Sequence, residues 1–387
     1  MIPYPVLRVP GSMPKMICFF FTFFIMNGKS FSVNLEGMKK AFNSIIVRMP
    51  NWIGDFVMAT PILVDLKKAF PDAEITAMCS TPMAPLLEFD PVIDELFCFS
   101  ESQGFFRRIR ERNIVEKLKK GKYDLGILLP NSFSSAWRFW QGNVKYKLGF
   151  KADGRRFLLD KALPFPENRK TQHLVLTYKA LLEPLGIPIS ETYPRLILKE
   201  KEVCEGWEFV KRFDITPQHK VIGINPGAAY GSAKCWLPER FREVAKELIA
   251  AHPSHAVLFF GDMSHKPLLS EICKGLPPRV VNLAGQTHLR ELMALMKLCS
   301  VFLTNDSGPM HMADSLDVPL VALFGSTDSV VTGPYRQSEQ VIQKHVPCAP
   351  CFKRECPIDF PCMKKIGVSE VVNAVLSQMK SEVEIGC

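Results

Sequence analysis

Short apolar runs alternate with amphipathic stretches along most of the chain. In the first half, runs rich in apolar and β-branched residues predict strands at Ser44–Met49, Ala73–Cys79, Val92–Phe99, Tyr123–Leu129 and Val144–Phe150. Helical periodicity lies between them, most clearly at Phe56–Phe70 and His173–Leu185. This alternation predicts a parallel sheet that is covered by helices on both faces.

The same alternation begins again after a looser segment at residues 186–201. The second half predicts strands and helices in turn, at Lys220–Asn225, Pro238–Ala251, His255–Phe260, Lys266–Leu276, Arg279–Leu283 and Leu289–Cys299. A chain of 387 residues is longer than one core usually organises. We therefore predict an α/β protein with two facing Rossmann-like domains, at residues 38–200 and 201–387, and a ligand site in the cleft between them.

The stretch from Val301 to Asp328 carries the clearest indication of a ligand. It reads as a strand, a polar turn, a short helix and a second strand at Val318–Phe324. Ser307 or Gly308 can cap the helix, and Pro309 suits its first turn. The free amides at this helix N-terminus predict a bound anion such as a phosphate or diphosphate, although an ordinary βαβ turn without ligand is the alternative.

Two other loops follow predicted strands, at residues 50–55 and 226–236. In the first, Gly54 lets the backbone approach a ligand, and Asp55 opens the helix, where it can act as a helix cap or take part in chemistry. In the second, Lys234 can bind a phosphate as a point charge. Neither loop contains GxxxxGK[ST] or GxGxxG, which weighs against a P-loop ATPase and a nicotinamide dehydrogenase.

The composition is that of a globular protein, with 47% hydrophobic and 22% charged residues. The formal charge is +9, and Lys and Arg are concentrated between residues 107 and 156. This density favours an anionic partner, which could be nucleic acid, an acidic lipid surface or a phosphorylated substrate. A solvated helix face is the alternative for the first part of the cluster.

Residues 1–37 do not resemble part of a domain. The apolar segment Met16–Met26 is too short to span a bilayer, which takes ~20 residues. It resembles the core of a signal peptide, but no small-residue cleavage site follows it. We predict a non-domain extension, with translation beginning at Met38.

The chain has 12 cysteines, and eight of them are scattered singly, as expected for free thiols in a reducing compartment. The other four form a cluster, Cys348, Cys351, Cys356 and Cys362. They could bind a structural zinc ion or an iron–sulfur cluster. The spacing lacks a second CxxC, so thiols that pack or oxidise are the alternative.

Several loop sequences agree in order and spacing with one known family. They are PNWIGDFVMATP, HLVLTYKALLEPLG, NPGAAYGSAKCWLPERF, NLAG, TNDSGPMHMADSLDVPLVALFGSTDS and PCAPCFKRECPIDFPCMKKI. Over residues 38–379 the chain resembles the ADP-heptose:lipopolysaccharide heptosyltransferases, which are glycosyltransferases of GT-B architecture, and it is most like their type II members.

The resemblance implies a role for each candidate residue. Asp55 would be the general base, Lys234 would bind the donor diphosphate, and Asp306 would contact the donor sugar. The diphosphate would be cradled by Ser307, Gly308 and His311, and Gly261 would lie beside the nucleoside. Pro309 departs from the family, which usually has an amide-bearing residue at this position.

The implied activity is inverting transfer of heptose from ADP-L-glycero-D-manno-heptose to the heptose-bearing inner core of lipopolysaccharide, with no cofactor required. The enzyme would be cytoplasmic and peripheral to the inner face of the cytoplasmic membrane. The alternatives are a GT-B enzyme with another nucleotide-sugar donor, a type I acceptor, or a non-catalytic module that binds nucleotide or nucleic acid. We expect no nucleic-acid partner, because no recognition helix or RNA-binding aromatic motif occurs.

Overall fold

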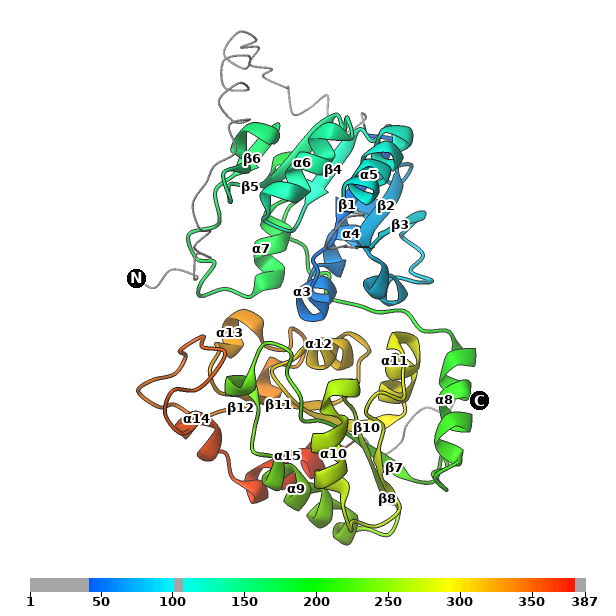
Figure 1. Ribbon diagram of the computed structural model, residues 1–387, viewed down its shortest axis with the longest axis vertical. Helices are drawn as coiled ribbons and strands as arrows, with labels where there is room; N and C mark the ends of the chain where they lie inside the picture. The colour runs from blue at the N-terminus through cyan, green and yellow to red at the C-terminus, as the bar shows by residue number, and fades with distance from the viewer. Residues whose placement is uncertain (1–41, 101–106, 380–387) are drawn as a thin grey trace.

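Two six-stranded sheets organise the two halves of the molecule (Figure 1). The computed structural model describes residues 42–100 and 107–379. In the N-terminal sheet the strands are ordered β3-β2-β1-β4-β5-β6, and all neighbours run parallel. Their bounds are Ser44–Arg48 (β1), Glu74–Ser80 (β2), Glu95–Phe99 (β3), Leu125–Leu128 (β4), Tyr146–Phe150 (β5) and Lys161–Leu163 (β6).

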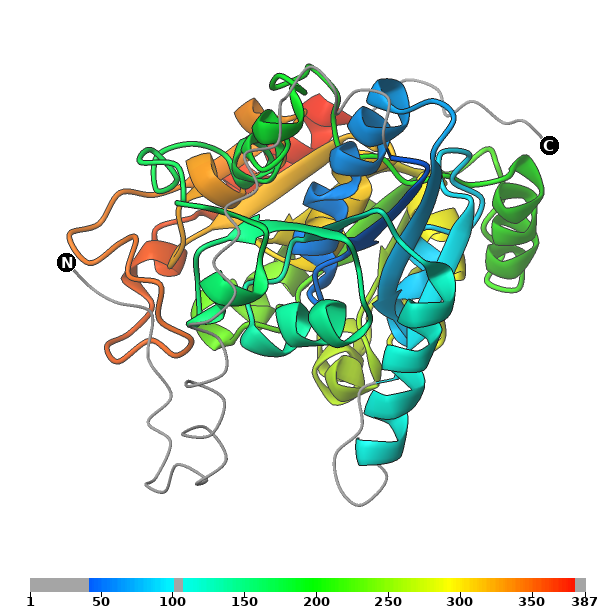
Figure 2. The same ribbon diagram turned by 90° about the horizontal axis from the view of Figure 1, so that it is seen from above.

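Helices cover both faces of this sheet. Ile45 and Val47 of β1 pack into one core with α4, whereas Ile46 between them packs into another with α5. Seen from above, α4 and α5 lie on opposite sides of the strands (Figure 2). The helices are Ile53–Met58 (α3), Thr60–Ala69 (α4), Arg107–Gly121 (α5), Phe133–Gln141 (α6) and Leu174–Ala180 (α7), with 3-10 turns at Thr81–Leu86, Arg155–Leu158 and Glu183–Leu185.

The C-terminal sheet repeats this design, with parallel neighbours in the order β12-β11-β10-β7-β8-β9. Its strands are Lys220–Asn225 (β7), His255–Phe259 (β8), Val280–Asn282 (β9), Cys299–Asn305 (β10), Leu320–Phe324 (β11) and Val341–Gln343 (β12). Its helices are Pro238–Ala251 (α9), Lys266–Cys273 (α10), Leu289–Lys297 (α11), Gly308–Ser315 (α12), Ser329–Thr332 (α13), Pro361–Lys364 (α14) and Val368–Gln378 (α15). The prediction of two Rossmann-like domains with parallel sheets is confirmed.

The two domains are joined by a segment without helix or strand at residues 187–199 and then by α8, Glu200–Lys211. This helix packs beside α11 of the C-terminal domain (Figure 1). The predicted boundary between residues 200 and 201 falls in the first turn of α8. The expected extension at residues 1–37 lies outside the described residues.

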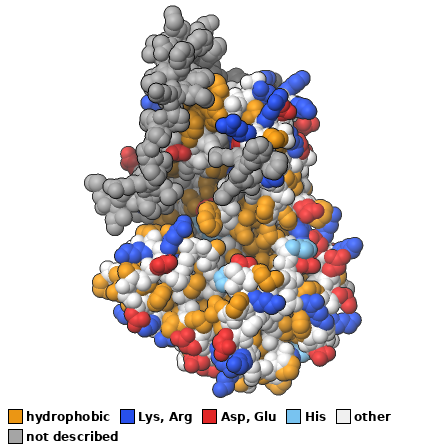
Figure 3. All heavy atoms as spheres, viewed as in Figure 1, with side chains coloured by type: hydrophobic (Ala, Val, Ile, Leu, Met, Phe, Trp, Pro, Cys, Tyr) orange, Lys and Arg blue, Asp and Glu red, His pale blue; other side chains and the backbone are white. Residues whose placement is uncertain are grey.

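One apolar core continues from the first domain into the second. It contains Phe56 of α3 and also Met310 and Met312 of α12, all of them buried. Hydrophobic side chains accordingly gather at the waist between the two domains (Figure 3). Because this shared core removes apolar surface from water, the two domains pack directly against each other at the waist.

The structure differs from the sequence-based prediction at several element ends. The single helix expected at Phe56–Phe70 is two helices, α3 and α4, with Pro61 in the first turn of α4, where a missing amide costs nothing. The helix expected to reach Leu185 ends at Ala180, and a 3-10 turn containing Pro184 follows. Within residues 42–100 and 107–379, no helix is long and apolar enough to cross a membrane.

Candidate active site

The N-termini of two helices, one from each domain, face each other at the cleft. α3 follows β1 and α12 follows β10, so both begin at the carboxyl edges of their sheets (Figure 1). A Cβ on Gly54 would lie 2.9 Å from Cδ2 of His311, and a Cβ on Gly308 would lie 2.9 Å from Cβ of Ile53. Only glycine permits this approach at both positions. The close contact fixes the separation of the two domains at the site.

Asp55 is the third residue of α3 and follows Gly54 at this contact between the domains. The N-cap position of α3 belongs to Trp52, and no side chain caps the helix. The alternative that Asp55 is the helix cap is therefore wrong. Burial raises the pKa of the Asp55 carboxyl from 3.8 to about 6, with Lys234 opposing the rise and Asp306 adding to it. A carboxylate with this pKa is ionised at neutral pH and is a better base than an ordinary aspartate.

Lys234 and Asp306 form an ion pair on the opposite side of the cleft. Lys234 ends a 3-10 turn, and its Nζ lies 2.5 Å from Oδ2 of Asp306. Both side chains are largely buried, with 14% and 4% of their surface exposed. The Thr327 hydroxyl also donates to Oδ2 of Asp306. The pair thus holds a lysine ammonium in a fixed place at the cleft, where it can meet an anion.

Two asparagines that were not among the predicted site residues hold these loops together. Asn305 accepts a hydrogen bond from the Trp236 amide and donates one to the Pro226 carbonyl, so it joins the Lys234 loop to β10. Asn225 donates to the Ser307 hydroxyl at 3.3 Å. Both asparagines end strands at the carboxyl edge of a parallel sheet, which is where ligand-binding residues gather in such folds. That position is the signal that could have found them.

No side chain caps the first turn of α12. Ser307 takes the N-cap position, but its hydroxyl is bonded to Thr304 and Asn225 and caps no amide of the helix. Pro309 follows in the first turn and has no amide to offer. The N-terminus of α12 therefore presents the positive end of its dipole with fewer donors than a helix without proline.

His311 lies one turn further along α12 and is 5% exposed. Burial, helped by the nearby charges of His173 and Lys234, lowers the pKa of its imidazole to about 3. The ring is therefore neutral at physiological pH. If it contacts a diphosphate, it does so as a neutral hydrogen-bond donor and not as a cation.

Gly261 follows β8 in a second loop of the C-terminal domain. A Cβ on Gly261 would lie 3.0 Å from Cβ of His265, and one on Gly227 would lie 2.6 Å from Nε2 of the same histidine. His265 thus packs between the loop that leads to Lys234 and the loop that carries Gly261. Asp262 caps the adjoining turn by accepting from the amides of Ser264 and His265. A structural role in this turn accounts for the carboxylate of Asp262.

The four clustered cysteines lie in the segment between β12 and α15, and all four line one cavity of about 50 Å³. Cys348 is exposed, Cys351 and Cys356 are half-buried, and Cys362 is buried. Across the described ranges, no three His, Cys, Asp or Glu side chains stand close enough together to hold a metal ion. The metal predicted from the spacing stays a prediction.

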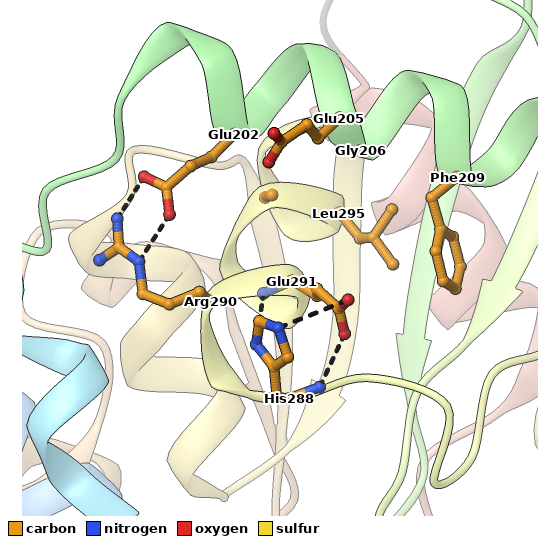
Figure 4. A pocket seen from close by; sticks show the side chains of 9 residues that line it. Glu202, Glu205, Gly206, Phe209, His288, Arg290, Glu291 and Leu295 are labelled. Atoms are coloured by element: carbon orange, nitrogen blue, oxygen red, sulfur yellow. Dashed lines mark hydrogen bonds and ion pairs between the residues drawn. The ribbon is translucent and has the colours of Figure 1, made fainter.

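A buried arginine joins the two domains beside the cleft. Arg290 of α11 forms an ion pair with Glu202 of α8 (Figure 4). Its guanidinium also donates to the carbonyls of Pro85 and Ile197. Next to this pair, α8 and α11 enclose a cavity of about 150 Å³. On the N-terminal side, His173 makes a second crossing contact, with 2.9 Å between its Nε2 and the Gly333 carbonyl. The orientation of the domains is thus set at points outside the candidate site.

Comparison with known proteins gives consistent matches. The model of glycosyltransferase family 9 (heptosyltransferase) matches residues 111–360. Lipopolysaccharide heptosyltransferase 2 of Salmonella typhimurium is 31% identical, over 77% of this chain and 87% of its own length. Lipooligosaccharide heptosyltransferase 2 of Campylobacter jejuni serotype O:2 is 29% identical, over 87% of this chain and 98% of its own length.

Solved structures agree with the sequence matches. The structure of the Escherichia coli ADP-heptose lipopolysaccharide heptosyltransferase II superposes with a TM-score of 0.74 and 26% identity, covering 87% of this chain and 98% of that one. The family 9 glycosyl transferase of Veillonella parvula superposes with a TM-score of 0.76 and 26% identity, covering 87% and 97%. The arrangement of two domains with parallel sheets is therefore shared with these proteins.

Proposed function

The chain belongs to glycosyltransferase family 9, the heptosyltransferases, and from this premise we propose that it transfers heptose from ADP-L-glycero-D-manno-heptose to a heptose of the lipopolysaccharide inner core, with inversion at the anomeric carbon. The observation that supports it best is Asp55, a carboxylate with a raised pKa that faces the Lys234–Asp306 pair across the cleft. A base and an anion site on opposite walls are what a single displacement requires.

In the proposed reaction the acceptor hydroxyl is bound beside α3 and the donor beside α12. Asp55 takes the proton of the attacking hydroxyl. A carboxylate with a pKa of about 6 is ionised at neutral pH, and its pKa is near the operating pH, as is best for a general base. The hydroxyl oxygen bonds to the anomeric carbon as the bond to the diphosphate breaks. One displacement from the face opposite the leaving group inverts the configuration.

The leaving ADP gains negative charge as this bond breaks. Lys234 is held at the cleft by Asp306, and an ammonium has three donors, so it can meet the diphosphate while it keeps its partner. The N-terminus of α12 adds the positive end of a helix dipole. Because both groups are fixed before the reaction, they stabilise the developing charge without rearranging.

We also propose that the enzyme attaches peripherally to the cytoplasmic membrane through its first domain. α5 exposes Arg108, Arg110, Lys119 and Lys120, which suits an anionic lipid surface or a phosphorylated core. Beside it, Phe133 and Trp140 of α6 and Phe157 of the 3-10 turn Arg155–Leu158 are exposed, and the half-buried ring of Trp137 stacks on Phe133 and Trp140. Aromatic rings next to basic residues are typical of proteins that sit at a bilayer surface.

Mass spectrometry of purified core acceptors incubated with ADP-heptose tests the proposed transfer. We expect the mass of one added heptose on the acceptor that already carries one heptose, and at least ~100-fold slower formation of this product with Asp55→Asn. Asp72→Asn is the matched control, because Asp72 is an exposed carboxylate in the turn before β2. Transfer from ADP-glucose or UDP-glucose at a higher kcat/KM would contradict the proposed donor. Transfer to the acceptor without heptose would contradict the proposed acceptor.

A further inference from the structure

The segment from residue 344 to residue 360, between β12 and α14, has neither helix nor strand. Segments of this length without regular structure are uncommon in compact domains and usually have a function. Its side chains from Phe352 to Glu355 are exposed, so little of it is held by an apolar core. Something other than hydrophobic burial must therefore stabilise its shape.

Cys348, Cys351, Cys356 and Cys362 all line the cavity beneath this segment. The cavity volume is about 50 Å³, enough for a single ion or water. Thiolate sulfur is the ligand that Zn²⁺ and iron prefer in structural sites of four cysteines. No three of the described His, Cys, Asp or Glu side chains stand close enough together to hold an ion, so binding requires the cysteine side chains to turn toward one another.

A second observation at the same cavity concerns Ser326, which is 1% exposed. Its hydroxyl has no hydrogen-bond partner in the described part of the chain, although it lines the cavity with the cysteines. A buried hydroxyl without a partner costs free energy, and a neutral thiol is only a weak acceptor. A metal-bound thiolate carries negative charge and accepts such a bond well. The unpaired hydroxyl is thus explained if the sulfurs are thiolates.

A third observation is an amide bond to sulfur. The backbone N–H of Phe360 donates to Sγ of Cys356 at 3.3 Å. Hydrogen bonds from amides to sulfur are a recognised means of stabilising cysteine-bound metal centres. From the cavity, the unpaired hydroxyl and this bond, we propose that Cys348, Cys351, Cys356 and Cys362 bind one structural metal ion, zinc or iron.

The segment that the metal would fix is bonded to both loops that hold Lys234 and Asp306. The Ala233 amide, next to Lys234, donates to the Arg354 carbonyl at 3.0 Å. On the other side, the amides of Cys351 and Phe352 donate to the Ser326 carbonyl, at 3.0 and 2.7 Å. Ser326 immediately precedes Thr327, whose hydroxyl holds Asp306. The proposed metal therefore stabilises the two loops that hold Lys234 and Asp306, and it takes no part in the transfer itself.

The test begins with the metal content of the full chain purified under reducing conditions. We expect about one equivalent of zinc or iron per chain in elemental analysis, and less than about 0.2 equivalents in Cys351→Ser. Cys98→Ser is the matched control, because Cys98 is also a free thiol but lies on β3 of the other domain. It should keep the full content of the unaltered chain.

A second measurement follows the segment itself. Lys353 and Arg354 are exposed, so trypsin can cut here when the segment loosens. We expect removal of the metal with a chelator to speed cleavage at these residues at least tenfold, and zinc to restore resistance. ADP affinity of the stripped chain should fall roughly tenfold, about the value of one hydrogen bond that positions Lys234.

The proposal is overturned if the chain holds less than about 0.1 equivalents of metal, both as isolated and after anaerobic incubation with zinc or ferrous iron. It is also overturned if Cys351→Ser keeps its metal, or if a disulfide between two of the four cysteines is found in place of the ion. Metal content and cleavage do not depend on the sugar donor. A loaded chain that fails to transfer heptose would therefore contradict the proposed function and leave the metal site standing.

Discussion

Replacing Asp55 by asparagine separates the role of a general base from a structural role, because the two predict opposite changes in stability. In the folded chain, burial raises the pKa of this carboxyl to about 6, from 3.8 for an aspartate that is fully in water. A rise of about two units corresponds to roughly 3 kcal/mol at 1.36 kcal/mol per unit. This is the free energy that the ionised carboxylate costs the folded state.

The sign follows from the direction of the shift. A raised pKa means that the folded state binds the proton more tightly, so the cost is absent below pH 4 and fully present above pH 6. Asp55 is partly exposed, and asparagine also loses hydration in the same place, so only part of the cost is recovered. We expect Asp55→Asn to be more stable by about 1–2 kcal/mol at pH 7.5 and unchanged near pH 4.

The same variant should lose activity. Removing a general base typically lowers the rate by ~10² to 10⁴. We expect kcat of Asp55→Asn to fall at least ~100-fold while ADP binding stays near that of the unaltered chain. Urea unfolding at pH 4.5 and 7.5, followed by tryptophan fluorescence, and steady-state kinetics measure the two effects. A variant that is less stable at pH 7.5, or one that turns over at the normal rate, would refute the assignment of Asp55 as a buried base.

Three further substitutions test the neighbouring parts of the site. Lys234→Ala should weaken ADP binding and lower kcat/KM by about 10², since a charge-assisted hydrogen bond is worth ~1.5–3 kcal/mol, and calorimetry with ADP measures the binding part. Gly54→Ala should fold but lose at least ~10-fold in activity, because its methyl group would meet the His311 ring at 2.9 Å; unchanged kinetics would show that the two helices separate freely. Arg290→Met should lower stability by ~3 kcal/mol in thermal unfolding, because it leaves the carboxylate of Glu202 without its partner, whereas Arg112→Met at an exposed pair should change it by less than ~0.5 kcal/mol.

Local pattern was sufficient to find most of the elements. The strand at Lys220–Asn225 and the helix at Pro238–Ala251 have the predicted bounds, because their apolar period is long and their ends carry clear signals. The break between α3 and α4 was missed because the apolar period continues across it. The edge strands β6 and β12 were missed because their residues are at most half-buried and form no apolar run of a strand's usual length, unlike those around the equally short β9.

The candidate site was predictable only as a set of separate loops. Sequence placed Asp55, Lys234 and Asp306 at strand ends, and the resemblance to a family suggested their roles. The ion pair between Lys234 and Asp306 depends on β7 lying next to β10. The hydrophobic pattern of a single segment does not show which strands are neighbours. The pKa of Asp55 likewise depends on tertiary structure, because burial raises it and the charges of Lys234 and Asp306 in the other domain act on it. Asn225 and Asn305 were overlooked because single asparagines at strand ends are common in turns.

The raised pKa of Asp55 also couples the base to donor binding. Lys234 lowers the pKa of this carboxyl, whereas Asp306 and burial raise it. A bound diphosphate places negative charge beside Lys234. This charge offsets the positive charge of Lys234, which in the free enzyme favours the ionised form of Asp55. The pKa of Asp55 should therefore be higher in the donor complex than in the free enzyme. We expect the acid limb of kcat to lie at higher pH than the acid limb of kcat/KM, which reports the free enzyme. Coincident limbs, or a kcat limb at lower pH, would mean that the diphosphate binds away from Lys234.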